Sequence, residues 1–326
     1  MNDPAARGRL ASVRLTTRLR FRLEDCATAV LEQACRLVPR RATPALGAVV
    51  GTGAWLLAGR RRQIALDNAR RALGGELGPG PCGSLVRRAY RQFGRILLEG
   101  LMFPRYSARD AGTLLRYTGL EHIRSAYESG RGVLLFSGHY GNWELVALMQ
   151  GYLGMPLTMI TRPLDNPLLE RRLARLRGLS GNEIQHKKHA LRPMLAALSA
   201  GRGVAIVIDQ NVRDGSAVFV DFFGRKAATT PALALLALRT GAAVMPVFAI
   251  PEGSGRYRVE YLPEVVPVRT GDRQADVLDL TQRCTQVIER YVRAHHGAWL
   301  WMHDRWKTRP PDEGGKKAPQ AKEALA

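Results

Sequence analysis

An α/β fold with a mostly parallel central sheet flanked by helices is predicted by two features of this sequence. Short, continuous apolar runs alternate with longer segments of helical period through the second half of the chain. A strand that is buried on both faces reads as an uninterrupted apolar run, which is typical of a parallel sheet covered by helices. The chain has 326 residues, of which 46% are hydrophobic, and can therefore bury a sizeable core.

The expected strands and helices follow one another from about residue 114. The apolar runs predict strands at residues 133–136, 157–160, 204–208 and 244–250. The intervening and following segments predict helices at residues 143–152, 167–179, 189–199, 231–240 and 276–295.

The first third of the chain is expected to be helical, basic and associated with a membrane. Apolar residues recur every three or four positions over 23–38, and Pro39 ends this helix. Residues 42–59 carry no charge and are followed by three arginines at 60–62. This stretch has the minimum length of a spanning helix but is rich in Gly, Ala and Thr. A helix that lies in the membrane interface or packs on the domain is therefore favoured over a span, with Trp55 at headgroup depth.

Two further helical segments are expected over residues 60–102, separated by a Gly- and Pro-rich turn at 74–83. Both carry arginines on one side and apolar residues on the other. This pattern suits either a packed helix with a solvated face or peripheral attachment to a membrane. The chain thus divides into a basic helical membrane-associating region (1–110), an α/β domain (111–307) and a disordered tail (308–326) rich in Pro, Gly, Lys and Glu.

The net charge of +21 is concentrated near the N-terminus, where 19 Lys and Arg stand against 7 Asp and Glu up to Arg105. Such a segment attracts polyanions: nucleic acid, an anionic membrane surface or an acidic protein. The chain has no RNA-binding aromatic signature and no recognition-helix module, so nucleic acid is not expected as a partner. A non-catalytic basic protein that binds a membrane or nucleic acid is the alternative from another functional class.

One segment, RGVLLFSGHYGNWEL (131–145), combines a strand, a small-residue turn and the start of a helix. His139 lies in the turn, where ligands bind in open α/β sheets. Glu144 follows in the first turn of the helix and is expected to reach back to the imidazole. A carboxylate in that position fixes the tautomer of a histidine that acts as a general base. Backbone N–H groups near Gly138 and Gly141 are expected to bind an oxyanion; a structural, hydrogen-bonded histidine is the alternative.

Other reaction chemistries find less support in the sequence. The GxSxG, GxGxxG and Walker patterns are absent, so neither a serine nucleophile nor a nucleotide cofactor is predicted. The four cysteines at 26, 35, 82 and 284 lack CxxC spacing, and the histidines do not complete a zinc-ligand pattern. No metal and no disulfide framework are expected.

The segment SGHYGNWE resembles the HxxxxD/E motif of the glycerolipid acyltransferase superfamily. Over residues 45–307 the chain resembles the bacterial lipid A biosynthesis (lauroyl/myristoyl) acyltransferases and their glycolipid relatives, which include phosphatidylinositol mannoside acyltransferases. The resemblance continues in order through RQFGRILLE, ITRPLDNP, VIDQN, VFVDFFGRKAATTPALALLALRTGAAVMPVF and WLWMHDRWK.

The resemblance implies that His139 is the catalytic base and that Glu144 is its partner. It also implies a set of substrate-binding residues: Arg162, Asp209, Asn142, Phe223 and Arg225. Arg162 follows a strand end, where a guanidinium could bind a phosphate or polarise a thioester carbonyl. Phe223 could line the acyl or acceptor site, with a packing role as the alternative, and Arg225 could lie near a phosphate.

The implied activity is the transfer of a fatty acyl chain from a thioester to a hydroxyl of an anionic membrane glycolipid such as a lipid A precursor. Acyl carrier protein is the expected donor. The alternative is another glycolipid or phospholipid acceptor, such as a phosphatidylinositol mannoside, with acyl-CoA as donor. No cofactor beyond these co-substrates is expected.

The expected location is the cytoplasmic face of the inner membrane, because basic residues flank the apolar stretch 42–59. A cluster near the C-terminus adds to this expectation, since aromatic and basic side chains together suit a membrane interface; the alternative is that two of its tryptophans close the core. Its members are Trp299, Trp301, Arg305, Trp306 and Lys307.

Overall fold

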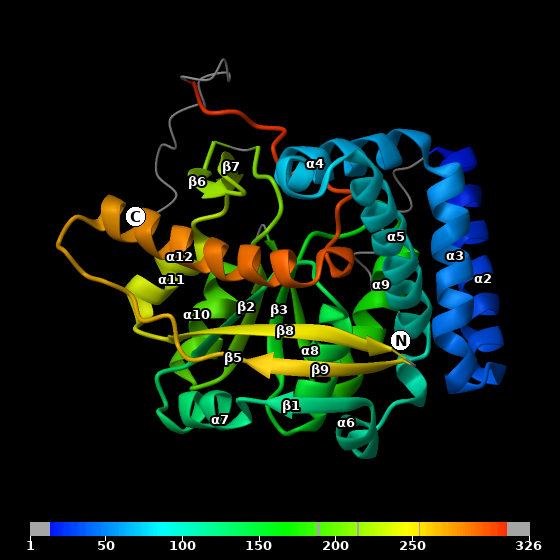
Figure 1. Cartoon of the computed structure of the whole chain (residues 1–326). Helices are drawn as coiled ribbons and strands as arrows, with labels where there is room; N and C mark the ends of the chain where they lie inside the picture. Colours follow the sequence, from blue (N-terminus) through cyan, green and yellow to red (C-terminus); the bar gives the residue numbers. More distant parts are fainter. Residues whose placement is uncertain (1–13, 188–189, 214, 254, 312–326) are drawn as a thin grey trace.

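A computed structural model describes residues 14–187, 190–213, 215–253 and 255–311 (Figure 1). Its central sheet contains the strands β1 (Leu115–Thr118), β2 (Val133–Ser137), β3 (Leu157–Thr161), β4 (Glu183–His186), β5 (Gly203–Val207), β8 (Ala243–Gly253) and β9 (Arg256–Tyr261). The strand order is β1-β9-β8-β2-β5-β3-β4. Strands β8 and β9 pair antiparallel, and every other neighbouring pair is parallel. The predicted α/β class with a mostly parallel sheet is confirmed.

Helices cover both faces of this sheet (Figure 1). They are α6 (Ala108–Leu114), α7 (Leu120–Glu128), α8 (Trp143–Tyr152), α9 (Pro167–Arg177), α10 (Leu191–Ser199), α11 (Ala232–Thr240) and α12 (Arg273–Ala294). The alternation of side chains along β2 separates the two cores. Leu134 and Phe136 pack with α10, α11 and α12, whereas Val133 and Leu135 pack with α6, α7 and α8.

The four strands expected from apolar runs are all present, within one residue at their starts. The expected helices are present as well, although α9 ends at Arg177 and continues as a 3₁₀ turn at Gly178–Ser180. His189, the expected first residue of one helix, lies outside the described residues. The predicted disordered tail (308–326) lies mostly outside them too, since the structure describes no residue beyond 311.

In the described residues, four long helices precede α6 and the sheet: α2 (Leu15–Leu37), α3 (Thr43–Leu57), α4 (Gly59–Leu77) and α5 (Pro79–Leu101). The turn expected at residues 74–83 is wrong, because Gly78 alone, at φ 74°, separates α4 from α5. Proline is tolerated in the first turn of a helix, where its missing N–H has no partner to lose. Pro79 and Pro81 therefore begin α5 and do not extend a loop.

Helix α3 lies directly against α5, and glycines make this contact possible. A Cβ on Gly51 would lie 2.1 Å from the Tyr90 carbonyl oxygen, and one on Gly94 would lie 2.2 Å from that of Gly47. The two backbones thus touch without intervening side chains. No single helix in the described ranges is long and apolar enough to cross a membrane; α3 and α4, with residues 40–42, meet the criteria as a pair bent by 97°.

Helices α4 and α5 also contribute to the main core. Leu73 and Leu85 belong to the same buried cluster as Leu134 and Phe136 of β2. Helices α4 and α5 therefore pack on the α12 side of the sheet. The boundary at residue 110 stays a prediction.

Candidate active site

The turn between β2 and α8 is shaped by glycine and held by a cap. Gly141 has φ 58°, and a Cβ there would lie 1.5 Å from the Ala249 carbonyl oxygen, so only glycine fits. Asn142 caps α8 by accepting a hydrogen bond from the Leu145 N–H at 3.0 Å. The chain thereby turns back at the carboxyl end of β2 and carries His139 at this edge of the sheet.

Asp209 is the carboxylate that holds His139. It follows β5, the parallel neighbour of β2, so the two strands end side by side. Its Oδ1 lies 2.7 Å from the imidazole Nδ1, and its Oδ2 accepts the His139 backbone N–H at 2.7 Å. Burial opposes the charge of Asp209, but His139 and Trp299 lower its pKa to about 2. The expectation that Glu144 reaches the imidazole is therefore wrong, and Asp209, expected to bind substrate, takes that position.

These contacts assign the protonation of the ring. An ionised carboxylate can only accept, so the Nδ1 of His139 carries the proton and its Nε2 presents a lone pair. The amide nitrogen Nε2 of Gln210 lies 3.1 Å from this ring nitrogen and donates to it. The imidazole is thus in the form required of a general base, with an exposed amide on the atom that would take the proton.

The segment 299–306 forms the base of the site. Trp299 donates its indole N–H to Asp209 Oδ2 at 2.7 Å, and the Leu300 N–H donates to the His139 carbonyl at 3.0 Å. Trp299, Trp301 and Trp306 are at most 3% exposed, so the aromatic cluster expected at a membrane interface is instead part of the core. Arg305 is also buried; burial lowers its pKa to about 10, and the charge of Asp209 opposes that shift.

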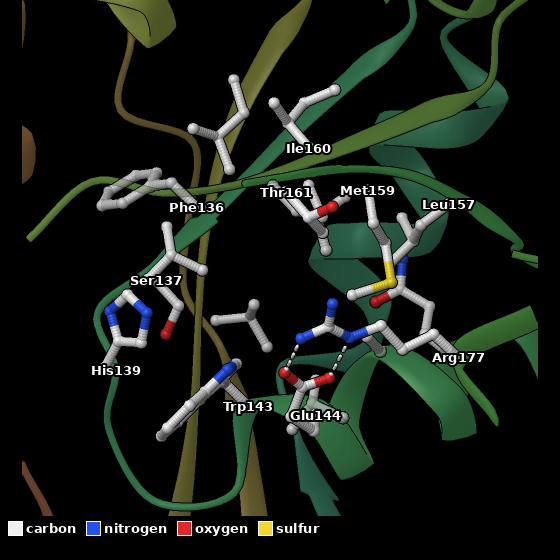
Figure 2. A pocket seen from close by; sticks show the side chains of 18 of the residues that line it. Phe136, Ser137, His139, Trp143, Glu144, Leu157, Met159, Ile160, Thr161 and Arg177 are labelled. Carbon is white, nitrogen blue, oxygen red and sulfur yellow. Dashed lines mark hydrogen bonds and ion pairs between the residues drawn. The ribbon is translucent and has the colours of Figure 1, made fainter. Parts of the chain in front are cut away.

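Glu144 pairs with Arg177 at the end of α9. The two guanidinium contacts to its carboxylate measure 2.8 and 2.5 Å, which makes the pair bidentate. Figure 2 shows the Glu144 carboxylate turned toward Arg177, with the Trp143 ring between this pair and His139 in that view. Trp143 also contacts the imidazole edge to face, with ring centroids 4.9 Å apart. The HxxxxE spacing thus brings both residues to one cavity without bringing them together.

A cavity of about 360 Å³ opens beside His139, between the sheet and helices α8 and α9 (Figure 2). Its polar wall contains the imidazole, the Glu144–Arg177 pair, Gln150, Thr161, Arg162 and Gln210. Most of the remaining wall is apolar: Leu135, Phe136, Val146, Ala147, Leu157, Met159, Ile160, Leu164, Leu173, Ala205, Ile206, Val207, Val247 and Ala249. Its volume lies in the range of small-molecule sites. Arg162 is exposed on this wall, as expected for a substrate contact.

Besides Asp209, which holds the imidazole, three residues expected to bind substrate do not line this cavity. Asn142 is fully buried and donates to Glu99 at 2.6 Å, behind the turn between β2 and α8. Phe223 and Arg225 belong to the hairpin of β6 (Val218–Phe222) and β7 (Arg225–Thr229). Phe223 has φ 54° and packs against Trp301, so the packing alternative describes it better. Arg225 is exposed on the hairpin.

Backbone donors for an oxyanion are fewer than expected. The N–H groups of His139, Tyr140 and Gly141 already donate to Asp209 Oδ2 and to the carbonyls of Gly138 and Ala298. The remaining candidates are the free amides in the first turn of α8 and the guanidinium of Arg162. Among the described residues, no group of three or more His, Cys, Asp or Glu side chains is placed to hold a metal ion.

Sequence reasoning missed three residues of this site: Trp143, Arg177 and Gln210. Trp143 and Gln210 lie in the segments NWE and VIDQN, directly next to predicted site residues. Nothing in the sequence distinguishes Arg177 as a site residue, because four other arginines lie nearby, at 162, 171, 172 and 175.

Known proteins with similar sequences agree with this architecture. The profile of the family described as bacterial lipid A biosynthesis acyltransferase matches residues 21–308. A phosphatidylinositol mannoside acyltransferase of Mycolicibacterium smegmatis is 27% identical over 76% of this chain and 81% of its own length. The lipid A biosynthesis lauroyltransferase of Escherichia coli is 29% identical over 69% and 72%, and a palmitoleoyltransferase of the same organism is 27% identical over 70% and 73%. The chain belongs to the bacterial lipid A biosynthesis acyltransferase family and is an O-acyltransferase.

Proposed function

We propose that this enzyme moves a fatty acyl chain from an acyl thioester to a hydroxyl of a membrane glycolipid, with His139 as general base. One observation carries the proposal. The imidazole lies at a largely apolar cavity, and the carboxylate on its Nδ1 leaves the lone pair on Nε2, where a hydroxyl can replace the exposed Gln210 amide. An apolar cavity beside a base suits a reaction that places a hydrocarbon chain next to a hydroxyl.

The reaction begins when the acceptor hydroxyl replaces the Gln210 amide at Nε2. His139 removes the hydroxyl proton as the oxygen attacks the thioester carbonyl, and Asp209 stabilises the imidazolium that forms. Arg162 and the first-turn amides of α8 stabilise the tetrahedral oxyanion. The intermediate then expels the thiolate, which takes the proton back from His139, and the products are an ester and a thiol.

Glu144 acts on the cavity wall in this scheme. Its pairing with Arg177 ties the first turn of α8 to the last turn of α9, and both helices line the cavity. The pair neutralises a guanidinium that would otherwise face the acyl chain. Glu144 is therefore a residue of the active site whose contribution is the shape and charge of the cavity.

The N-terminal helices offer a surface suited to a membrane. The side of α2 that faces away from α9 exposes an apolar row, Leu15, Leu19, Leu23, Val30 and Leu37, and α3 exposes Leu46, Val49, Val50, Leu56 and Leu57. The opposite side of α2 is anchored by ion pairs of Asp25 and Glu32 with Arg172 and Arg175 of α9. Exposed leucine and valine rows on α2 and on the uncharged α3, which is followed by the arginines at 60–62, suit an interface with lipid. We place the enzyme at the cytoplasmic face of the inner membrane, where donor and glycolipid meet.

Acyl carrier protein is the proposed donor, because the chain is basic and that partner is acidic. A lipid A precursor is the proposed acceptor, and a phosphatidylinositol mannoside with acyl-CoA as donor is the second candidate. The similarity to named enzymes of both kinds supports each. A non-catalytic basic protein is disfavoured by family membership and by the arranged His139–Asp209 pair.

Mass spectrometry of membrane glycolipids from a deletion strain tests the acceptor, because the missing acyl chain identifies it. Complementation with His139→Ala tests the base. We expect the variant to fold and insert normally while its turnover with purified donor and glycolipid falls by about 10²- to 10⁴-fold. Normal glycolipids in the deletion strain, or full turnover by His139→Ala, would end the proposal.

A further inference from the structure

A second pocket, about 470 Å³ in volume, lies between α5 and the segment that ends α12. All its ionisable lining residues are basic: Arg88, Arg91, Arg95, His295 and His296. The rest of the wall consists of Gln92, Pro251, Ala294, Gly297 and Ala298. The cavity of the active site shares none of these residues.

The three arginines form one face of α5 and are not neutralised. In the part of the chain that the structure describes, Arg88, Arg91 and Arg95 form no ion pair. Arg88 donates to the Ser84 hydroxyl, and Arg95 donates through Nε to the Pro44 carbonyl, so two of the three guanidinium groups have neutral partners. Glu99 lies close enough for Arg95 to lower its pKa but does not pair with it.

Gln92 places a buried amide in the wall of the pocket. It is 6% exposed, and its Nε2 has no hydrogen-bond partner within 3.5 Å in the described ranges. Burial raises the pKa of the Tyr257 hydroxyl, and the nearby Gln92 amide opposes that rise. A buried donor without a full hydrogen bond is unfavourable unless a ligand or water accepts from it. Burial lowers the pKa of His296; Glu76 opposes this effect, and Arg88 and Arg293 add to it. Three arginines and the Gln92 amide therefore line a pocket whose lining residues include no carboxylate, which suits the binding of an anion.

The position of the pocket indicates where the anion comes from. Helix α3 packs on the same part of α5, because a Cβ on Gly51 would lie 2.6 Å from the Arg91 Cα and one on Gly47 would lie 2.5 Å from the Arg95 Cα. The outer side of α3 exposes Val49 and Leu57 at 68% and 88%. At a membrane surface, acyl chains lie next to phosphates. The exposed apolar side of α3 would face the acyl chains, and the neighbouring arginines of α5 would face the phosphates.

We propose that this α5 pocket binds the phosphate of an anionic lipid headgroup and fixes the enzyme on the membrane beside the exposed side of α3. This inference rests on the proposed function, since it assumes that the substrate is a membrane lipid. Arg88 and Arg91 supply the charge, and Gln92 supplies a donor from the buried wall.

Vesicle binding tests the proposal without any measurement of turnover. The probes are phosphatidylcholine vesicles and phosphatidylcholine vesicles that contain phosphatidylglycerol. Arg88→Gln/Arg91→Gln spares Arg95, whose Nε supports α3, and is expected to bind the anionic vesicles about 30-fold more weakly, at roughly fivefold per arginine. Binding to neutral vesicles is expected to stay unchanged. Arg124→Gln/Arg192→Gln is the matched control, because both arginines are exposed on α7 and α10, away from α5 (Figure 1).

Two results overturn the proposal. Equal losses in the two double variants would mean that net charge acts without a site, and an unchanged Arg88→Gln/Arg91→Gln would mean that the pocket does not contact lipid. A third arm uses coenzyme A in solution. If the double variant loses affinity for coenzyme A but keeps its affinity for anionic vesicles, the pocket binds the phosphate of a soluble donor and the lipid assignment is wrong.

Gln92→Leu keeps every charge and removes only the unpartnered amide, so it separates a built pocket from a diffuse basic patch. A weaker affinity for anionic vesicles is expected; an unchanged affinity would contradict the role of Gln92. His139→Ala serves as a further control and is expected to bind vesicles like the wild type. The vesicle-binding result can therefore be interpreted even if the acyl-transfer proposal fails.

Discussion

Two carboxylates lie at the candidate active site, and each binds a different kind of side chain. Asp209 is 4% exposed at the end of β5 and holds an imidazole, whereas Glu144 lies five residues from that imidazole in the chain and holds Arg177. Asp209 is 70 residues away from His139. The comparison teaches that neighbouring parallel strands place their following residues together more reliably than a short spacing across a turn does.

The largest effect is expected at Asp209. Asp209→Asn keeps the shape of the side chain but cannot stabilise an imidazolium, and its amide nitrogen can force the wrong tautomer on His139. We expect kcat to fall by about 10³-fold or more with little change in KM. Steady-state kinetics with saturating acceptor measures this, and a change confined to KM would contradict the role of Asp209.

A smaller loss is expected at Glu144. Glu144→Gln leaves Arg177 without its charge partner at the cavity wall, so we expect about a 10- to 100-fold loss of activity through misplacement of the substrate. A double-mutant cycle of Glu144→Gln and Arg177→Gln, measured by denaturant unfolding, tests the pairing. The two losses of unfolding free energy are expected to be non-additive by about 1–3 kcal/mol. A loss as large as that of Asp209→Asn, without coupling to Arg177, would restore Glu144 as the partner of His139.

A third carboxylate sharpens the comparison through stability. Burial raises the pKa of Glu99 to about 7, although Tyr257 and Asn142 donate to it. A raised pKa in the folded state favours folding at low pH, and this contribution is lost as pH rises from the unfolded value of 4.5 through about 7.

Glu99→Gln removes this titration and keeps a partner for Tyr257 and Asn142. Relative to the wild type, we expect the variant to gain about 2 kcal/mol of unfolding free energy between about pH 5 and about pH 8. Denaturant unfolding at the two pH values measures the gain. A difference that does not depend on pH would mean that Glu99 is ionised in the folded protein throughout this range.

The smallest effect is expected at Gln210. Its amide occupies the His139 Nε2 that the acceptor hydroxyl needs, so Gln210→Ala removes a competitor worth one hydrogen bond. We expect the KM for the acceptor to fall by up to about fivefold with kcat nearly unchanged. A large loss of kcat would instead assign Gln210 to the transition state.

The sheet was predictable because its central strands are continuous apolar runs bounded by turns. Strands β1, β4, β6, β7 and β9 were not predicted, since charged residues such as Glu183, Arg225 and Arg258 interrupt them. His139 was predictable from its place after a strand, and Arg162 and Asp209 from strand ends and family resemblance. The pairing of His139 with Asp209, and of Glu144 with Arg177, was not predictable. Each depends on how the strands and helices align in space and on which side chains become buried, and the composition of a segment does not determine either.

The tryptophans show the same limit. Trp299 and Trp301 beside basic residues look the same in sequence whether they face lipid or a buried aspartate. The indole N–H of Trp299 finds Asp209, and that of Trp301 finds the His296 carbonyl, so both contribute to the core. Long-range hydrogen bonds decide between the two readings.

The central claim is that Asp209, and not Glu144, sets the protonation of His139. Nitrogen-15 NMR of labelled histidine in the wild type, Asp209→Asn and Glu144→Gln tests it directly. We expect a protonated Nδ1 with the signature of a carboxylate partner in the wild type and in Glu144→Gln, and loss of that signature in Asp209→Asn. Loss of the signature in Glu144→Gln, with an unchanged His139 in Asp209→Asn, would contradict the role of Asp209.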